Sequence, residues 1–360
     1  MKKYLVRLTP LEPYFFGNEK CFSFDDGNPR GQMSNRYYIR SERTPLQTTL
    51  LGAMRYLFIP TKKSDFNYDE NEYEAIKKYI GSESFKIASS AEQDFGVIKN
   101  LSPLFLMKGA GILIPTPLDH IKGQEKYTPF DNYKKINTAD GIKLYTDQFD
   151  VKAGLSDSYT DIDTKDIVAC EEIFSTVTRV GINRNPNNKA FFKKDYITLQ
   201  QGYCFAFCME LSDEADITSV ERYVYLGQGK SLFTVSFEPT ELNMAERIRP
   251  LIGENAVYCF GDTLAESRIY DNAMFSVVDF RDYRAYETLA KGKVKKDTIL
   301  YRLIKAGSIF IVADKETADD IRSKNLSGVI NCCNNKNCRN IGFNEVITKN
   351  REEQRNGTSL

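Results

Sequence analysis

Residues 222–238 read Arg-Tyr-Val-Tyr-Leu-Gly-Gln-Gly-Lys-Ser-Leu-Phe-Thr-Val-Ser-Phe-Glu, and the centre of this stretch at first looks like a phosphate-binding loop. The P-loop pattern requires a glycine five residues before the second glycine, where this chain has Val224, and a helix after Lys-Ser. Instead, residues 232–237 alternate with a period of two, with Phe233, Val235 and Phe237 on one side. The stretch therefore predicts a short glycine turn that leads into a strand.

The glycine turn has more than one interpretation. Glycine allows another backbone to approach closely, and a lysine beside it supplies a cation for phosphate. On this basis we expect contact with a phosphate backbone from Gly227, Gln228, Gly229, Lys230 and Ser231. A tight turn with a purely structural role is the alternative. A nucleotide site is a third possibility, and the missing glycine at position 224 counts against it.

Bulk composition narrows the class of protein. The chain has 360 residues, enough for two domains, and its 49 basic residues balance 49 acidic ones, so net charge does not indicate a partner. No stretch approaches the ~18 apolar residues of a membrane span, and the basic start lacks the apolar segment of a signal peptide. The eight cysteines are scattered as reduced thiols would be, so we expect a cytoplasmic protein without a membrane partner.

Histidine is the most informative residue type because the chain has one, His120, in a loop-like context. A single histidine argues against a His-rich metal site and against a Ser-His-Asp triad. Cys332, Cys333 and Cys338 have the spacing Cys-Cys-x4-Cys but lack a fourth ligand nearby. We therefore predict no catalytic residue, no metal and no other cofactor, with a structural zinc at these cysteines as the alternative.

The N-terminal region combines a predicted strand over residues 3–9, an arginine-rich loop over residues 25–43 and a helix over residues 44–59. Thr44 as N-cap, with Gln47 completing a capping box, predicts where the helix begins. The loop therefore leads into a helix N-terminus, where free N–H groups favour anions. We expect RNA contacts from Arg30, Arg36, Arg40, Arg43, Thr44, Gln47 and Thr48. A solvated loop before an ordinary amphipathic helix is the alternative.

Residues 183–194 predict a basic arm between a strand at 173–182 and strands at 196–199 and 203–211. The arm carries four cations and no acid, with two phenylalanines among them. Cations that follow phosphates and rings that stack on bases are typical of single-stranded nucleic-acid binding. Candidate RNA contacts here are Arg179, Asn183, Arg184, Lys189, Phe191 and Phe192. An exposed hairpin kept soluble by lysines is the alternative. The last of these strands is apolar on both faces, which predicts a central position in a sheet.

The remaining regions are less informative. Residues 61–172 read as an insertion with a helix at 71–80 and short strands at 104–107 and 111–114, after which it becomes loop-rich. In the helix we expect Tyr73, Ile76 and Ile80 to point inward and Glu74 to pair with Lys78. The acidic run between residues 157 and 172 indicates a solvated surface or a protein-facing patch, with paired carboxylates for two-metal nuclease chemistry as a further alternative. After residue 238 the chain predicts a second set of strands and helices, including helices at 241–251 and 317–324.

Six motifs in a fixed order carry a family resemblance. They are Pro13-Tyr-Phe-Phe16, Thr44-Pro-Leu-Gln-Thr-Thr-Leu-Leu-Gly-Ala-Met-Arg55, Thr178-Arg-Val-Gly-Ile182, Gly227-Gln-Gly-Lys-Ser231, Ala306-Gly-Ser-Ile-Phe310 and Gly342-Phe-Asn-Glu-Val346. Together they resemble the RAMP superfamily of CRISPR proteins, and most closely the family of third subunits of the type III-B Cmr effector complex, in the Cas-five-like group. The resemblance spans nearly the whole chain. It departs from the family at Gly17-Asn-Glu-Lys20, where Arg-Asp-Gly is usual, and in having fewer glycines in the turn at 227–231.

The resemblance implies an α+β fold of two ferredoxin-like (RRM-type) modules with loop-rich insertions. We expect the first module at 1–238, with an insertion at about 61–172, the second at 239–350 and a flexible tail at 351–360. The implied role is non-catalytic: holding the 5′ tag of the guide RNA (crRNA) and docking on the large polymerase-type subunit and the backbone RAMP subunit. The same resemblance adds Asn18 and Lys20 to the candidate RNA contacts. A RAMP endoribonuclease that processes guide RNA is the alternative function.

Overall fold

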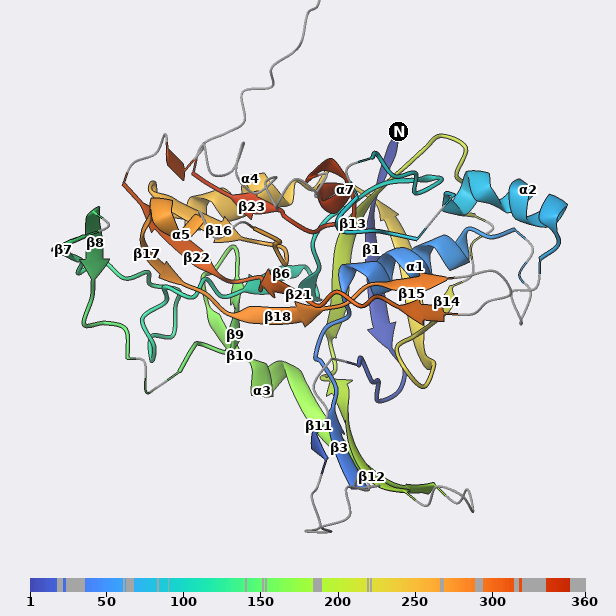
Figure 1. Ribbon diagram of the computed structural model, residues 1–360, viewed down its shortest axis with the longest axis horizontal. Coiled ribbons are helices and arrows are strands. Elements are labelled where there is room, and N and C mark those ends of the chain that lie inside the picture. Colours follow the sequence, from blue (N-terminus) through green and yellow to red (C-terminus); the bar gives the residue numbers. More distant parts are fainter. Residues whose placement is uncertain are drawn as a thin grey trace, which may run out of the picture.

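The chain folds around a large antiparallel sheet in a mixed α+β arrangement (Figure 1). A computed structural model describes residues 1–17, 22–23, 36–60, 62, 68–82, 84–89, 91–139, 141–150, 152, 154–183, 190–218, 220, 222–265, 269–288, 294–313, 317–318 and 335–349. It describes the backbone but not the side chains of residues 22–23, 36–37, 182–183, 190–191, 272, 287–288, 294 and 335. No helix in this described part of the chain is both long and apolar enough to cross a membrane.

The largest sheet has nine strands. In spatial order these are β10 (Ile167–Ala169), β9 (Ser158–Asp161), β6 (Gly111–Pro115), β5 (Phe105–Lys108), β13 (Tyr203–Leu211), β1 (Lys2–Pro10), β15 (Ser231–Pro239) and β14 (Tyr223–Leu226), with β4 (Ile98–Leu101) also paired to β13. The region predicted as a loop-rich insertion thus supplies five strands of this sheet. The central position predicted for residues 203–211 is confirmed, because β13 has β1 on one side and β4 and β5 on the other.

The other described strands form two smaller sheets and three ribbons. One sheet has the order β17 (Ala273–Val277), β22 (Ile309–Val312), β16 (Ala256–Cys259) and β23 (Val346–Ile347), and the other the order β11 (Phe174–Asn183), β12 (Ala190–Leu199), β3 (Arg36–Arg40) and β2 (Phe22–Ser23). The ribbons pair β18 (Phe280–Tyr283) with β21 (Tyr301–Ile304), β19 (Tyr286–Thr288) with β20 (Val294–Lys296), and β7 (Lys134–Thr138) with β8 (Gly141–Tyr145).

The helices among the described residues are short. They are α1 (Gln47–Leu57), α2 (Glu70–Ile80), α3 (Cys170–Ile173), α4 (Met244–Ile248), α5 (Ile269–Asn272) and α7 (Asn335–Asn340), with a 3-10 turn at Arg249–Leu251. The predicted helix at 241–251 is therefore confirmed in shortened form. Of the predicted helix at 317–324, residues 319–324 lie outside the described residues.

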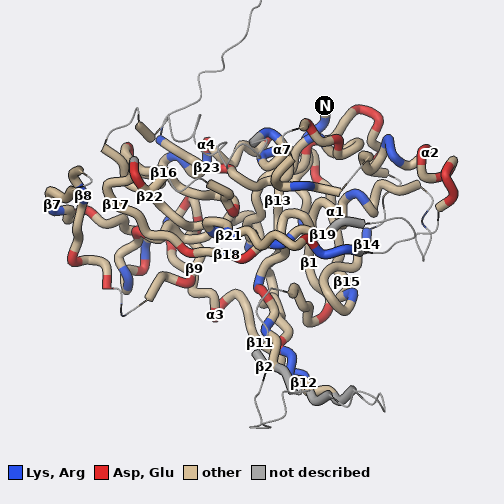
Figure 2. Tube along the Cα trace, viewed as in Figure 1, with Lys and Arg blue, Asp and Glu red and all other residues tan. Residues whose placement is uncertain are grey.

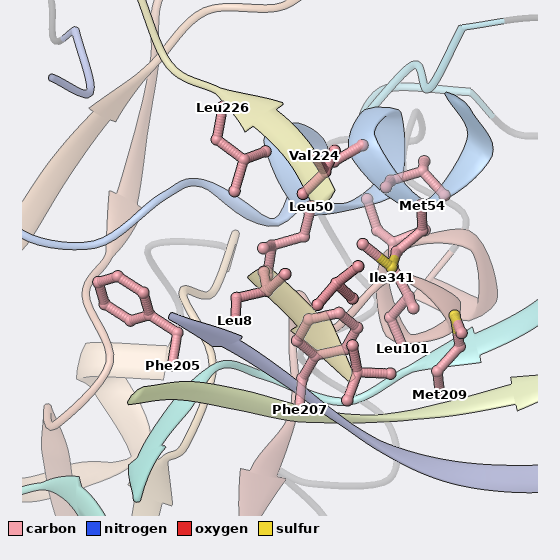
Figure 3. Close-up of a cluster of buried hydrophobic side chains, with 14 of the residues drawn as sticks. Leu8, Leu50, Met54, Leu101, Phe205, Phe207, Met209, Val224, Leu226 and Ile341 are labelled. Atoms are coloured by element: carbon pink, nitrogen blue, oxygen red, sulfur yellow. The ribbon is translucent and has the colours of Figure 1, made fainter. Parts of the chain in front are cut away.

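One face of the large sheet packs against α1. Strand alternation places Leu8 of β1 and Phe205 and Phe207 of β13 on this face, where all three are fully buried. Leu50 and Met54, one helical turn apart on α1, fill the same core, and Val224 and Leu226 of β14 enter it from the edge (Figure 3). The apolar stripe predicted for this helix is thus its core-facing side.

The other face of the large sheet packs against the smaller sheet that contains β16. Leu5, Ala206 and Cys208 belong to this second core, together with Tyr258 and Ile309 of the smaller sheet. Two sheets packed face to face bury alternate residues of both. The outer face of the smaller sheet has its own apolar layer around Val257, Cys259 and Phe310, all fully buried.

The two N-terminal helices differ in detail from their predictions. The N-cap of α1 is Leu46, with no side-chain cap hydrogen bond, so the capping box of Thr44 and Gln47 is wrong. A capping box does begin α2, between Asp69 and Glu72. On α2, Lys77 takes the place predicted for Lys78 as the ion-pair partner of Glu74. Of the three side chains predicted to point inward, Ile76 is buried and Tyr73 is 41% exposed, because α2 packs through a narrow stripe at the end of the molecule.

Gln47 has a structural role in place of capping. Its side chain is buried, and its Nε2 donates to the carbonyls of Ser102 at 3.2 Å and Gly342 at 3.4 Å. Gly342 has φ +86°, and a Cβ there would lie 2.5 Å from Gln47 Nε2. Three distant segments therefore interlock at a site that has no room for a side chain at position 342.

We expect Gly342→Ala to destabilise the fold more than Gly202→Ala. The two glycines have nearly the same φ, +86° and +87°, but a Cβ at Gly202 would meet nothing within 4 Å. Each alanine carries the cost of the left-handed backbone, about 1–2 kcal/mol, so the difference between them isolates the steric part. Chemical denaturation should give a loss about 2 kcal/mol larger for Gly342→Ala. Equal losses would show that the interlock can relax.

Candidate nucleic-acid interface

A finger formed by β2, β3, β11 and β12 projects from the body of the molecule (Figure 1). β11 and β12 are antiparallel over ten residue pairs, and β3 runs parallel to β12. Lys and Arg residues lie along the described part of the finger (Figure 2). The arm predicted at 183–194 is thus the outer part of a long hairpin, of which residues 184–189 lie outside the described residues.

One face of the finger, which we call the basic-aromatic face, is defined by Arg179, Phe192, Lys194 and Tyr196. Arg179 and Lys194 are cross-strand partners. The guanidinium of Arg179 lies 4.6 Å from the centroid of the Tyr196 ring, and Lys194 Nζ lies 5.6 Å from that of Phe192. No acidic side chain lies on this face among the described residues of β3, β11 and β12. Its cations therefore have rings, and not carboxylates, as neighbours, which suits attraction to phosphate.

Gly181 fixes the position of one of these rings. It lies directly opposite Phe192 in the register, and a Cβ on it would come within 2.2 Å of the ring. The glycine therefore leaves a shallow seat in the strand surface for the aromatic side chain, as is common for cross-strand glycine and aromatic pairs.

The opposite face of the finger is organised around a buried acid, Asp195, which is 8% exposed. Thr178 donates to its Oδ1 at 2.6 Å, Tyr38 donates to its Oδ2, and Arg40 Nε lies 4.0 Å from it. Arg40 Nε also donates to Tyr38 Oη at 2.9 Å, which raises the pKa of Arg40. This network ties β3 and β11 to β12, so Arg40 has a structural role on the face opposite Arg179.

Phe15 connects the basic-aromatic face to the body. Its ring is fully buried, 5.5 Å from the Tyr196 centroid and 5.2 Å from Lys194 Nζ. Its carbonyl accepts a hydrogen bond from Gln228 N at 2.9 Å. The glycine turn at 227–230 therefore lies next to the base of the finger, and the two predicted RNA-binding regions are brought together.

The glycine turn leads from β14 into β15, so the predicted strand after Ser231 is confirmed and no helix is available to bind a triphosphate. The close approach that requires glycine is internal. Gly227 has φ +75°, and a Cβ there would lie 2.3 Å from the Phe15 carbonyl oxygen. Gly229 faces open space, and Gln228, Gly229 and Lys230 are exposed. Ser231 is buried, and its hydroxyl donates to the Pro13 carbonyl at 3.2 Å.

Arg43 also has an intramolecular partner. It forms an ion pair with Asp157, and its guanidinium lies 6.0 Å from the centroid of the Phe174 ring. Partial burial opposes the charged form of Asp157, but the hydrogen bond from Arg43 lowers the pKa of this carboxyl overall. Thr44 offers its carbonyl to Arg281 at 2.9 Å. The predicted anion site at the start of α1 is thus occupied by protein groups, because Gln47 faces inward and Arg43 faces Asp157.

The acidic run between residues 157 and 172 is largely engaged within the chain. Besides the Asp157 pair, Asp163 pairs with Arg247 at 2.5 Å and Asp166 with Lys126 at 3.7 Å. Asp161 caps its own turn by accepting from the Asp163 and Thr164 N–H groups. In the described part of the chain, no group of three or more His, Cys, Asp or Glu side chains could hold a metal ion.

The lone histidine is also part of the interior. His120 is 5% exposed, and its Nδ1 accepts from Thr128 N at 3.2 Å. Burial lowers the pKa of its imidazole. Cys338 is fully buried in α7, whereas Cys332 and Cys333 lie outside the described residues.

Several candidate contacts cannot be placed in this way. Asn18, Lys20, Arg30, Arg184 and Lys189 lie outside the described residues, and Arg36, Asn183 and Phe191 are described by backbone alone. The candidate RNA contacts predicted from the sequence did not include Phe15, Tyr196 or Lys194, although Lys194 is one of the four cations of the predicted arm. A signal for two of them is present in strand alternation, since Phe192, Lys194 and Tyr196 occupy every second position of β12.

We expect Gly227→Ala to disturb the base of the finger, because its Cβ would meet the Phe15 carbonyl. Gly154→Ala is the matched control, with φ +71° against +75° and nothing within 4 Å. Thermal unfolding should show a clear loss of Tm for Gly227→Ala and a small one, from about 1–2 kcal/mol of backbone strain, for Gly154→Ala. Equal losses of Tm in the two variants would show that the contact between the turn and Phe15 leaves room for a side chain at position 227.

Comparison with known proteins gives a match in three-dimensional structure alone. No protein-family model matches the sequence. No curated protein matches it either.

Two solved chains align with nearly all of this one. A chain in the cryo-EM structure of the type III-B Cmr-beta complex bound to cognate target RNA has a TM-score of 0.51 at 13% identity, covering 96% of both chains. A chain of the same complex with target RNA and AMPPnP, state 1, has a TM-score of 0.50 at 12% identity, again covering 96% of both. At this identity the two alignments show likeness of fold alone, over 96% of each chain. This chain therefore shares the fold of these chains from the type III-B Cmr-beta complex, in line with the resemblance that its motifs carry.

Proposed function

We propose that this protein is a non-catalytic, RNA-binding structural subunit of a type III CRISPR effector ribonucleoprotein in the cytoplasm. The observation that carries the proposal is the basic-aromatic face of the finger, which adjoins the exposed glycine turn through Phe15. On this proposal the face holds guide RNA.

The chemistry of the face suits a single strand. Arg179 and Lys194 supply two cations on a surface without carboxylates among its described residues, and Phe192 and Tyr196 supply ring surface beside them. Phosphates are attracted by the cations regardless of sequence, and an unpaired base has a π-face that can stack on a ring. Lys230, exposed in the glycine turn, adds a cation where the finger meets the body.

The fold supports the proposal at a second level. β1 has β13 on one side and β15 on the other, both antiparallel, with α1 following β1 in the chain and β4 and β5 beyond β13. This order is the one expected for a ferredoxin-like unit in which α1 is the first helix. We propose that residues 1–238 contain one such unit and that the region after residue 238 contains the second.

The finer roles follow from the family resemblance. We propose that the guide RNA is held at its 5′ tag, and that the protein contacts the large polymerase-type subunit and a backbone RAMP subunit of a type III-B complex. The solved chains with this fold come from complexes bound to target RNA. A role as an endoribonuclease has less support, because the single histidine is buried and accepts a backbone hydrogen bond.

We expect Arg179→Ala and Lys194→Ala each to weaken binding of single-stranded guide RNA. Each variant should also reduce the slope of log K against log salt by about 0.7, the value for one phosphate contact on a single strand. Lys135→Ala is the control, because Lys135 is an exposed lysine on the separate β7–β8 ribbon (Figure 1). Fluorescence anisotropy across a salt series measures both quantities, and an unchanged slope for both finger variants would remove the finger from the interface.

A cleavage assay tests the absence of catalysis. Purified protein incubated with end-labelled RNA containing the CRISPR repeat should leave the RNA intact over hours, with and without added Mg²⁺. Specific cleavage within the repeat, by an activity that co-purifies with the protein, would instead establish the endoribonuclease function.

A further inference from the structure

A pocket of about 310 Å³ lies at the β14 end of the large sheet, apart from the finger. Its lining residues are Tyr56 from α1, Tyr223, Val224 and Tyr225 from β14, and Leu232 from β15. Three of the five are tyrosines, and Tyr223 and Tyr225 are 54% and 61% exposed. The size is at the lower end of the range for small-molecule sites, which are typically lined by aromatic and apolar groups.

Strand alternation explains why these rings face outward. Val224 and Leu226 point into the core against α1, so Tyr223 and Tyr225 must lie on the other side of β14. There they stand opposite Thr234 and Leu232 of β15. Folding requires the inward pair to be apolar, but it places no such demand on the outward pair. Two exposed aromatic residues at consecutive outward positions are therefore unexplained by the core.

Three cations lie beside the lining residues, one of them in space and two of them in the chain. Lys62 Nζ lies 5.6 Å from the centroid of the Tyr56 ring. Arg222 directly precedes the first tyrosine of β14 and is exposed, and Lys230 is exposed in the turn that joins β14 to β15. The neighbouring acid, Glu12, accepts a hydrogen bond from Leu232 N at 3.0 Å. Aromatic walls with basic residues around them match a nucleotide, whose base is flat and whose phosphate is anionic.

The pocket is also continuous with the proposed RNA path. The pair Leu226 and Ser231 closes the glycine turn, and the next pair in the register is Tyr225 and Leu232, both of which line the pocket. The turn itself is hydrogen-bonded to Phe15 at the base of the finger. A single-stranded RNA that follows the basic-aromatic face to the turn therefore reaches the pocket within one further residue pair of β14 and β15.

We propose that this pocket binds one unstacked base of single-stranded RNA, which stacks on Tyr223 or Tyr225. The proposal rests on the proposed RNA-binding function and extends it from the finger to the edge of the large sheet. The pocket accepts any of the four bases, because each base can stack on the face of a tyrosine ring.

The test uses a 12-nucleotide single-stranded RNA that carries the fluorescent base 2-aminopurine at successive positions, since its emission falls when it stacks on a ring. The full-length protein should quench one position strongly. In the double variant Tyr223→Leu, Tyr225→Leu, which keeps apolar bulk on the strand, this quenching should be lost and binding should weaken about fivefold or more. The single variant Tyr225→Leu, at the more exposed position, provides the same readout with less risk to folding.

Two controls separate the outcomes. Tyr286→Leu removes a tyrosine of similar exposure, 56%, on β19, and should leave both quenching and affinity unchanged. Arg179→Ala on the finger should weaken binding but keep the quenched position at saturating protein.

Unchanged quenching and affinity in the double variant would overturn the proposed base-binding pocket and leave the proposed function standing. Loss of subunit assembly with RNA binding intact would assign the tyrosines to a protein partner. Absence of RNA binding by the unmodified protein would overturn both proposals.

Discussion

β1 is the strand on which the rest of the structure depends, because it is hydrogen-bonded on both sides and contributes to a buried core on each face. Its residues pair with β13 on one side and with β15 on the other, which joins segments about 200 residues or more apart in the chain. Val6 and Leu8 contribute to the core under α1, while Leu5 contributes to the core shared with the smaller sheet. A strand in this position fixes the register of both neighbours, since a slip by one residue would exchange the two cores.

The chain leaves β1 into the aromatic segment that supports the candidate interface. Phe15 lies between the glycine turn and the basic-aromatic face, and each of its contacts uses a different part of the residue: the carbonyl accepts from Gln228, and the ring packs against Tyr196 and Lys194. Because the ring is fully buried, Phe15 positions these neighbours without itself being exposed to a ligand. Phe15 thus places the base of the finger next to the glycine turn.

The two faces of the finger have different roles, because one stabilises the sheet and the other is the proposed binding surface. On one face the carboxylate of Asp195 accepts hydrogen bonds from Thr178 and Tyr38 and lies near Arg40. These interactions hold three strands together. On the other face the cations rest on rings. A buried acid on the first face stabilises the sheet without placing a negative charge on the second. This separation lets a projecting sheet remain ordered while one of its surfaces stays basic.

The sequence by itself determined the secondary structure around residues 203–211 and 231–239, the glycine turn and the absence of a P-loop helix, because alternation and glycine positions act locally. It also identified Arg179 and Phe192 as members of a basic, aromatic hairpin. It did not determine that Gln47 and Ser231 face inward, that Arg43 pairs with Asp157, or that Gly227 is required by Phe15. Each of these depends on a partner far away in the chain, and whether a polar residue binds a ligand or another part of the protein is decided by which groups tertiary packing brings within hydrogen-bonding distance.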